Sequence, residues 1–401
     1  MGDGFSPCAR WILNENRPVS GMPVILTGSK RAGRTKSYDA WCVVDGAPDG
    51  LDPDLKTPDL GLKLERAFDT EGRVWWEIAT NFGLESNTAE LSHTATCNSN
   101  VSDFGAMLAW TAIISDWHRA DTVTIVVCDD PWLRRHFAET LKLPVPPGQS
   151  LHLREWILLV RGYLVRVSYA VSAFFASIRL RGHRKSPPYG NNAIITYGHR
   201  ASTANGFDAY FGDLLDWNPK IMRLLHVDTN VGRAHELATK GRALSLHAWG
   251  RPLVALGLAF KRWRPLVRPR FATNYWLIRR AAALEAGTGT AAAIAWQIHC
   301  QERCLADLRP GLILWPWENH SWERALVRRA KLLSVFTIGY QHTVVGRRHW
   351  VHAITNSDGE ASLPDQVICS GLAWKVALET YGLPSDRLKI GGALRFSRSP
   401  R

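Results

Sequence analysis

The sequence contains no run of about 20 uncharged apolar residues, and its N-terminus has no basic segment followed by an apolar one. The first absence argues against a membrane-spanning helix, and the second argues against a secretory signal peptide. The sequence also lacks a zinc-finger spacing and a basic helix that leads into a leucine zipper, so nucleic acid is the least favoured partner. We therefore expect a cytoplasmic protein that does not bind nucleic acid.

Cysteine and glycine-rich loops are also scarce. The seven cysteines are scattered along 401 residues, as is typical of a reducing compartment rather than a disulfide framework. Cys300 and Cys304 lie one helical turn apart beside His299, but we find no further ligands that would complete a metal site. Gly391-Gly392 lacks the remaining spacing of a dinucleotide-binding loop. The sequence thus predicts no metal and no bound cofactor.

What is present is an ordinary globular composition with a strong basic excess. With 46% hydrophobic and 21% charged residues, the chain can bury a large core and has the length of two or three domains. The net charge of +13 fits an anionic partner, either a membrane surface or a phosphorylated substrate. The 18 tryptophans indicate mainly core packing, with stacking platforms for carbohydrate as the alternative.

The stretch 311–396 has the clearest pattern. A helical segment, Ser321–Leu333, lies between the first two of four short apolar runs, and strand, helix, strand is the unit of a doubly wound α/β sheet. The four runs have the length and β-branched content of buried parallel strands: Leu312–Trp315, Val335–Ile338, Gln366–Cys369 and Leu388–Ile390. Two further strand-like runs upstream, Ala193–Tyr197 and Arg223–Val227, bring the total to about six strands, and Ser245–Gly250 leads into an apolar, basic run. We expect a Rossmann-like parallel sheet.

Titratable residues follow these strands directly. Glu318 comes after the run at 312–315, His342 follows Gln341 after the run at 335–338, and His199 and Asp228 follow two upstream runs. Open α/β sheets bind ligands beyond the carboxyl ends of their strands, so these side chains are candidates for one site. The alternatives are that Glu318 charges the start of the following helix and that His342 is a core histidine.

The first 150 residues predict a separate α/β region. Three strand-like runs (Met22–Leu26, Ala40–Val44 and Thr122–Cys128) accompany a helix expected over Phe104–Trp117. Asp103 precedes this helix and Asp129 follows the third run, so both are candidate substrate ligands. Helix capping is the alternative for Asp103, and capping by Asp130 with Pro131 at the first helical position is the alternative for the acidic pair.

The segment Leu151–Arg181 is long, helical in pattern and strongly apolar, but Arg161 and Arg166 interrupt it. Because arginine at the centre of a bilayer costs about 2.5–3.5 kcal/mol, we expect either an amphipathic helix on the inner membrane face or a helix packed across the sheet. Ser186-Pro187-Pro188 marks the expected domain boundary. We thus divide the chain into an N-terminal region (1–150), the amphipathic helix and linker (151–188) and a Rossmann-like domain (189–401).

Several short motifs occur together in a fairly specific order over most of residues 100–396. They are SDFGAMLAW, VVCDDPW, YGHRASTANGFDAYFGDLL, LLHVDT, LHAWGRPL, PWENHSWERAL, IGYQHTVVGR, SLPDQVICSG and RLKIGGALRF. In this combination the chain resembles bacterial surface-carbohydrate biosynthesis proteins, of O-antigen and capsule type, with a GT-B glycosyltransferase architecture. In GT-B enzymes a strand like that at 389–396 leads into the C-terminal domain that holds the donor nucleotide. The chain ends at Arg401, so we expect this donor domain to be truncated.

The resemblance implies transfer of a sugar from a nucleotide-sugar donor to a lipid- or saccharide-linked acceptor at the cytoplasmic membrane face. Such a reaction needs a base for the acceptor hydroxyl and positive charge for the leaving diphosphate. Glu318, His342 and His199 are the catalytic candidates, and Arg347 and Arg395 are the basic residues best placed for phosphate. The alternatives are a sugar-nucleotide epimerase of the same fold and a non-catalytic, membrane-associated assembly subunit.

Overall fold

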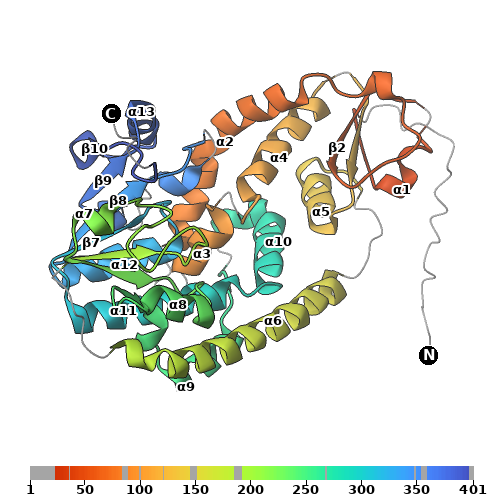
Figure 1. The fold of residues 1–401 in the computed structure, drawn as a ribbon. Coiled ribbons are helices and arrows are strands. Elements are labelled where there is room, and N and C mark those ends of the chain that lie inside the picture. The colour runs from red at the N-terminus through yellow and green to blue at the C-terminus, as the bar shows by residue number, and fades with distance from the viewer. Residues whose placement is uncertain are drawn as a thin grey trace, which may run out of the picture.

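The chain folds around two parallel β-sheets with helices on their faces (Figure 1). The structure is a computed structural model that describes residues 23–35, 37–83, 89–98, 101–120, 122–144, 151–184, 192–266, 269–346, 349–353 and 359–396. The expected domain boundary at 186–188 lies outside the described residues. The prediction of an α/β fold with Rossmann-like parallel sheets is confirmed.

The larger sheet has seven parallel strands in the order β10-β9-β8-β7-β4-β5-β6. Their bounds are β4 Asn192–Thr196, β5 Ile221–Leu225, β6 Ala243–Ser245, β7 Leu312–Pro316, β8 Phe336–Gln341, β9 Gln366–Cys369 and β10 Leu388–Ile390. Counted from its first strand, the sheet runs 3-2-1-4-5-6-7, which is the doubly wound order with one added edge strand. The direction of winding reverses between β4 and β7, which are hydrogen-bonded neighbours.

Both faces of this sheet are covered, which explains why its strands are apolar throughout rather than alternating. Along β4, Ala193 and Ile195 join the core cluster beneath the helices, whereas Ile194 joins a smaller cluster on the opposite face. The helical layer on the first face contains α6 Leu151–Arg179, α11 Thr290–Leu308, α12 Ser321–Leu332 and α13 Leu372–Thr380. The loop after β4 and the short helix α7 Leu214–Trp217 cover the other face.

The stretch Ser245–Gly250 contributes its first residue to a strand and the next four to a turn. The strand β6 ends at Ser245, whose hydroxyl accepts a hydrogen bond from the His247 backbone N–H and thereby starts the 3-10 turn η3 Leu246–Trp249. Short helices follow as α9 Pro252–Leu256 and η4 Gly257–Phe260, and α8 Val231–Ala238 precedes β6. The apolar residues of this stretch are buried in a turn, and periodicity alone does not distinguish such a turn from a strand.

The smaller sheet has three parallel strands in the order β1-β3-β2, namely β1 Val24–Thr27, β2 Ala40–Asp45 and β3 Thr124–Cys128. Its helices are α1 Ser29–Ala32, α2 Leu60–Gly83, α3 Ala89–Thr96, α4 Phe104–His118 and α5 Pro131–Thr140. Trp263, and Leu277 and Ile278 from α10 Tyr275–Ala286, complete its hydrophobic core. Residues far apart in sequence thus share the N-terminal core.

Buried histidines make the folded protein sensitive to acid. His136 and His247 are almost fully buried, and burial lowers the pKa of each to about 4. An unfolded histidine titrates near pH 6.5, so the unfolded chain binds more protons between these values. Stability is therefore fully present above about pH 6.5 and is lost as the pH falls toward 4, by up to about 3 kcal/mol for each histidine.

We expect the urea midpoint of unfolding to fall progressively between pH 6.5 and pH 4. H136Q replaces a titrating group by a neutral amide and should flatten this dependence, whereas substitution of the exposed His235 should leave its slope unchanged. A midpoint that does not change over this range would contradict the prediction.

Candidate functional site

The switch point between β4 and β7 brings together side chains that the sequence places more than 100 residues apart. Ligands of open α/β sheets bind in the crevice outside the carboxyl ends of the strands where the winding direction reverses. Here, the loop after β4 carries Tyr197 and Tyr210, the loop after β7 carries Glu318 and His320, and His342 follows β8. We call these five residues the switch-point cluster.

Glu318 lies between two histidines. His320 Nε2 is 2.8 Å from Glu318 Oε2, within hydrogen-bond distance, while His342 Nε2 is 3.8 Å from Glu318 Oε1. The second separation is too long for a direct hydrogen bond. It is short enough for one hydroxyl oxygen to contact both atoms at once. All three side chains retain some exposure, between 10% and 27%, so a ligand can reach them.

The charges of these three groups differ at neutral pH. The hydrogen bond with His320, opposed by burial, holds the pKa of Glu318 at about 2. Although burial alone would lower the pKa of His320, its bond to Glu318 and the nearby Glu323 raise it above the usual value. Burial lowers the pKa of His342 below 6.5, and Glu318 only partly offsets this. At neutral pH the cluster therefore holds an ionised Glu318 and a neutral His342, and His320 is more easily protonated than a free histidine.

Aromatic rings pack beside His342. The Tyr210 ring packs edge-to-face on His342 with centroids 5.1 Å apart, and Tyr197 lies 5.7 Å from Tyr210. His199 reaches the same group, with its ring 6.3 Å from that of Tyr210. The structure therefore brings the three catalytic candidates, Glu318, His342 and His199, to one edge of one sheet. The rings of Tyr197 and Tyr210 thus present aromatic surface beside polar groups.

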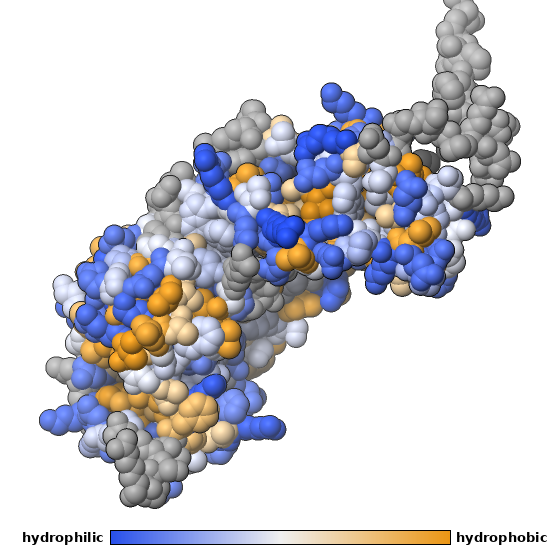
Figure 2. All heavy atoms as spheres, turned by 90° about the horizontal axis from the view of Figure 1, so that it is seen from above, coloured by the Kyte–Doolittle hydropathy of each residue, from blue (hydrophilic) through white to orange (hydrophobic). Residues whose placement is uncertain are grey.

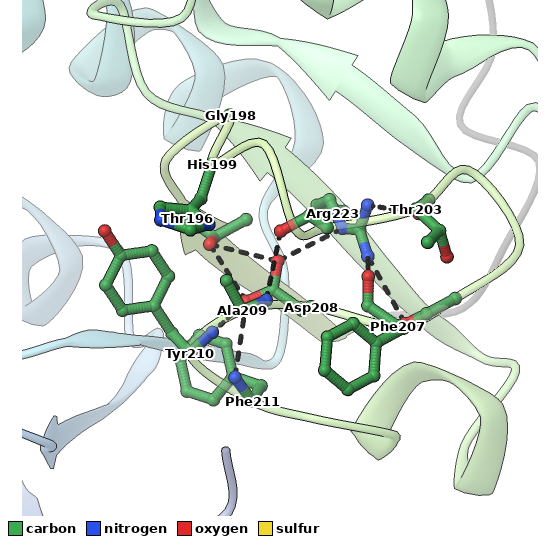
Figure 3. Close-up of polar contacts among 12 residues, drawn as sticks. Thr196, Gly198, His199, Thr203, Phe207, Asp208, Ala209, Tyr210, Phe211 and Arg223 are labelled. Carbon is green, nitrogen blue, oxygen red and sulfur yellow. Dashed lines mark hydrogen bonds and ion pairs between the residues drawn. The ribbon is translucent and has the colours of Figure 1, made fainter. Parts of the chain in front are cut away.

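A buried ion pair fixes the loop that carries Tyr210 and His199 (Figure 3). Asp208 is completely buried, its Oδ2 is 3.5 Å from Arg223 Nε on β5, and its carboxylate accepts hydrogen bonds from the hydroxyl of Thr196 and the backbone N–H of Tyr210. Arg223 donates in turn to the carbonyl oxygens of Thr203, Gly206 and Phe207 in the same loop. The loop is thus tied to the two strands β4 and β5.

The loop after β7 is braced by a helix from the N-terminal region. His93 Nε2 of α3 is 3.1 Å from the carbonyl oxygen of Asn319, and the Asn98 amide nitrogen is 2.9 Å from His320 Nδ1. Asn319 is fully buried in the left-handed region, with φ of 57°. This conformation is uncommon outside glycine, and asparagine tolerates it best. The helix α3 and Asn98 directly after it therefore help to orient His320 toward Glu318.

The carboxylate at the start of α12 belongs to Glu323. The sequence had left open whether Glu318 takes this role. The Glu323 carboxylate accepts hydrogen bonds from the backbone N–H groups of Glu318 and Asn319 and from the indole of Trp315, at the start of α12. Burial raises the pKa of Glu323 to about 7. Because Glu323 binds the free N–H groups ahead of the helix, Glu318 is left to face the histidines.

Four further candidates were expected near this edge of the sheet: Asp228, Arg395, Gln341 and Arg347. Asp228 Oδ2 is 3.4 Å from Nδ1 of His226, whose ring packs 4.6 Å from Tyr197, so Asp228 lies beside the cluster. Arg395 is exposed, and its positive charge helps to lower the pKa of His342 after the larger effect of burial. Gln341 is fully buried, and its Oε1 accepts a hydrogen bond from the hydroxyl of Ser370. Arg347 lies outside the described residues.

Asp103 and Asp129 belong to the N-terminal region, Asp103 directly before α4 and Asp129 directly after β3. The guanidinium of Arg280 binds both carboxylate oxygens of Asp103, at 2.6 and 2.8 Å, and Asp129 accepts from the backbone N–H of Ser29 beside β1. Asp130 caps α5 ahead of Pro131, as the capping alternative predicted. Neither Asp103 nor Asp129 contacts the group formed by Glu318 and His342.

Sequence reasoning missed His320, Tyr197 and Tyr210. His320, Tyr197 and Tyr210 all occur in the quoted motifs, and His320 comes two residues after Glu318. Nothing in the sequence indicated which side chains of these motifs would face the site. Among the described residues, no group of three or more His, Cys, Asp or Glu side chains is arranged to hold a metal ion. The cysteines that the structure describes are buried and free.

Comparisons with protein-family models, with curated proteins and with solved structures found no match to this chain. The fold and the site therefore define the class. The chain is a Rossmann-like α/β protein with a cluster of titratable side chains at the switch point of its larger sheet.

Proposed function

We propose that the chain transfers a sugar from a nucleotide-sugar donor to a hydroxyl of a lipid- or saccharide-linked acceptor, with a GT-B-like arrangement of its two sheets. One observation carries the proposal. A neutral His342 faces an ionised Glu318 at 3.8 Å, beside two tyrosine rings, at the position where doubly wound sheets bind ligands.

In the proposed step, the acceptor hydroxyl lies against His342 Nε2 and Glu318 Oε1. Its oxygen attacks the anomeric carbon, its proton passes to His342 Nε2, and the bond between the anomeric carbon and the diphosphate oxygen breaks. The nucleoside diphosphate leaves with the electron pair of that bond. Glu318 stabilises the imidazolium that forms on His342, and Arg395, whose charge acts on His342, attracts the diphosphate.

We distinguish the base from the orienting charge by the pKa of Glu318 and of His342. A carboxylate whose pKa lies at about 2 is a weak proton acceptor, whereas an imidazole whose pKa lies below 6.5 is neutral at pH 7 and ready to accept a proton. We therefore assign the base to His342 and the orienting charge to Glu318. His320 holds that charge in place through its 2.8 Å hydrogen bond.

The direct test is to incubate the purified full chain with a panel of nucleotide sugars and to measure release of the nucleoside diphosphate, with candidate acceptors and with water alone. Isothermal titration against the same panel measures binding separately. A donor that is isomerised and not cleaved would indicate the epimerase. Failure to bind any donor would overturn the proposal in favour of a non-catalytic subunit.

E318Q should lower turnover and move the acid limb of the pH–rate profile to lower pH. The charge of Glu318 raises the pKa of His342, so its removal lets burial lower that pKa further, and the imidazolium formed during transfer loses its counter-charge. The measurement is the initial rate across the pH range. E77Q, which removes a carboxylate that is 59% exposed, is the matched control and should leave the profile unchanged. An unchanged profile in E318Q would remove Glu318 from the reaction.

A further inference from the structure

The outward face of α6 carries large apolar side chains along its whole length. Trp156 is 60% exposed and Leu164 is 62% exposed. The same face includes Leu153, Ile157, Val160, Tyr163, Val171, Phe175 and Ile178. At about 100° per residue these positions fall within one sector of the helix, so the exposed apolar surface is continuous rather than scattered.

The short helices α9 and η4 extend this surface sideways. Both pack against α6, and the rings of Tyr163 and Phe260 lie 5.9 Å apart. Leu253 is 79% exposed and Phe260 is 69% exposed, with Val254 and Leu256 beside them. We call the outward residues of α6, α9 and η4 together the α6 face. Figure 2 shows the side of the molecule opposite α6, where hydrophobic residues lie in smaller groups among hydrophilic ones.

Arginines border the apolar sector of α6 in one row. Arg154 and Arg161 are seven residues apart, and Arg179 follows about five turns later, so the three side chains project from the same side of the helix. All three are exposed. An apolar sector with a row of cations at its border is the pattern of a helix that lies in a membrane interface, where arginine stems follow the apolar surface and their charges reach the headgroups.

The inward side fixes α6 along the body of the protein. Arg166, one of the arginines that interrupt the apolar pattern, points inward and donates to the carbonyl oxygens of Ala259, Ala286 and Thr288. At Gly162 a Cβ atom would lie 1.9 Å from the carbonyl oxygen of Ala286, so only glycine allows this approach. Among the described residues, α6 is the one helix long and apolar enough to cross a membrane, and 22% of its most apolar window is buried. These contacts favour a helix that lies on a surface.

The α6 face is basic, so an anionic partner complements it. In the described segments 151–184 and 251–266 the one acidic residue is Glu155, and Arg279 binds it through both carboxylate oxygens. A second copy of the chain would therefore oppose basic residues with basic residues. An anionic bilayer supplies both an apolar layer and negative charge. We propose that the α6 face docks the protein onto a lipid bilayer that contains anionic headgroups.

The test is flotation of the purified full chain with vesicles of phosphatidylcholine, with and without phosphatidylglycerol. Binding should need the anionic lipid and should weaken with added salt. The double variant L164S/F260S should bind at least about tenfold more weakly, because it removes two exposed apolar side chains. R161Q should weaken binding about fivefold, as expected for one cation near the surface. The vesicle measurement needs no substrate, so its result is independent of the proposed reaction.

Matched controls come from other surfaces. L332S removes a leucine that is 77% exposed at the end of α12, and R119Q removes an exposed arginine after α4, and both should bind vesicles like the unchanged chain. Because all these residues are exposed, circular dichroism and melting temperature should be unaffected. Absence of flotation would overturn the proposal. So would a dimer in sedimentation analysis that L164S/F260S dissociates, because that result would assign the face to a second copy.

Discussion

H342Q is expected to reduce turnover by about 10²–10⁴-fold, the range over which a positioned general base accelerates proton transfer. Glutamine keeps a polar side chain against Tyr210 and Glu318 but cannot accept the proton from an acceptor hydroxyl. The loss should appear in kcat more than in KM, because the interaction matters in the transition state. Initial rates with the best donor of the nucleotide-sugar panel, measured at pH 7, check this expectation.

The pH dependence provides a second readout of His342. Burial lowers its pKa below 6.5, so the unchanged chain should lose activity only as the pH falls below that value. H235Q replaces an exposed histidine outside the cluster and should keep both the rate and the acid limb. A rate for H342Q within a few-fold of the unchanged chain, with the same melting temperature, would show that His342 is not the base.

D208A is expected to destabilise the protein by about 3–5 kcal/mol, the loss typical when one partner of a buried ion pair is removed. The substitution leaves Arg223 charged, 2% exposed and without its carboxylate, and it frees the hydroxyl of Thr196 and the backbone N–H of Tyr210. Urea denaturation followed by circular dichroism measures the change. Because the loop carries Tyr210 and His199, donor binding should weaken as well.

The control for this substitution is D216A in the same region. Asp216 is half exposed and lies 3.6 Å from Arg242, so its removal should change stability by no more than about 1 kcal/mol. The double variant D208A/R223M should be less destabilised than the sum of its single variants, because neither charge then remains buried alone. Equal effects of D208A and D216A would show that the buried pair is not a major source of stability.

The parallel sheet could be predicted because local pattern and final environment agree. Runs such as Gln366–Cys369 and Leu388–Ile390 are short, β-branched and apolar, and the structure has β9 and β10 with the same bounds. The helix expected at 321–333 also forms as Ser321–Leu332, since its apolar positions repeat at the helical period. The strand β6 was not among the predicted runs. It has three residues and ends where the Ser245 hydroxyl caps a turn, and apolar composition does not report hydrogen bonding.

The position of Glu318 at a strand end was readable from the sequence, but its chemistry was not. The hydrogen bond of Asn98 to His320 and the distance from Glu318 to His342 join residues from different elements. Together with the local bond between Glu318 and His320, they decide which group is charged. Arg166 shows the same limit. The sequence identifies an arginine that interrupts an apolar helix, and only the packing reveals that it points inward to backbone carbonyls.

The sequence alone determined the class of fold, the positions of most strands and the edge at which polar residues gather, because these follow from periodicity and from the direction of parallel strands. The tertiary structure decided the strand order that places the switch point between β4 and β7, and which face of α6 is exposed. It also decided that His342 is neutral while Glu318 is ionised. These properties depend on contacts between distant segments, and a pKa is set by burial and neighbouring charge, which local sequence does not specify.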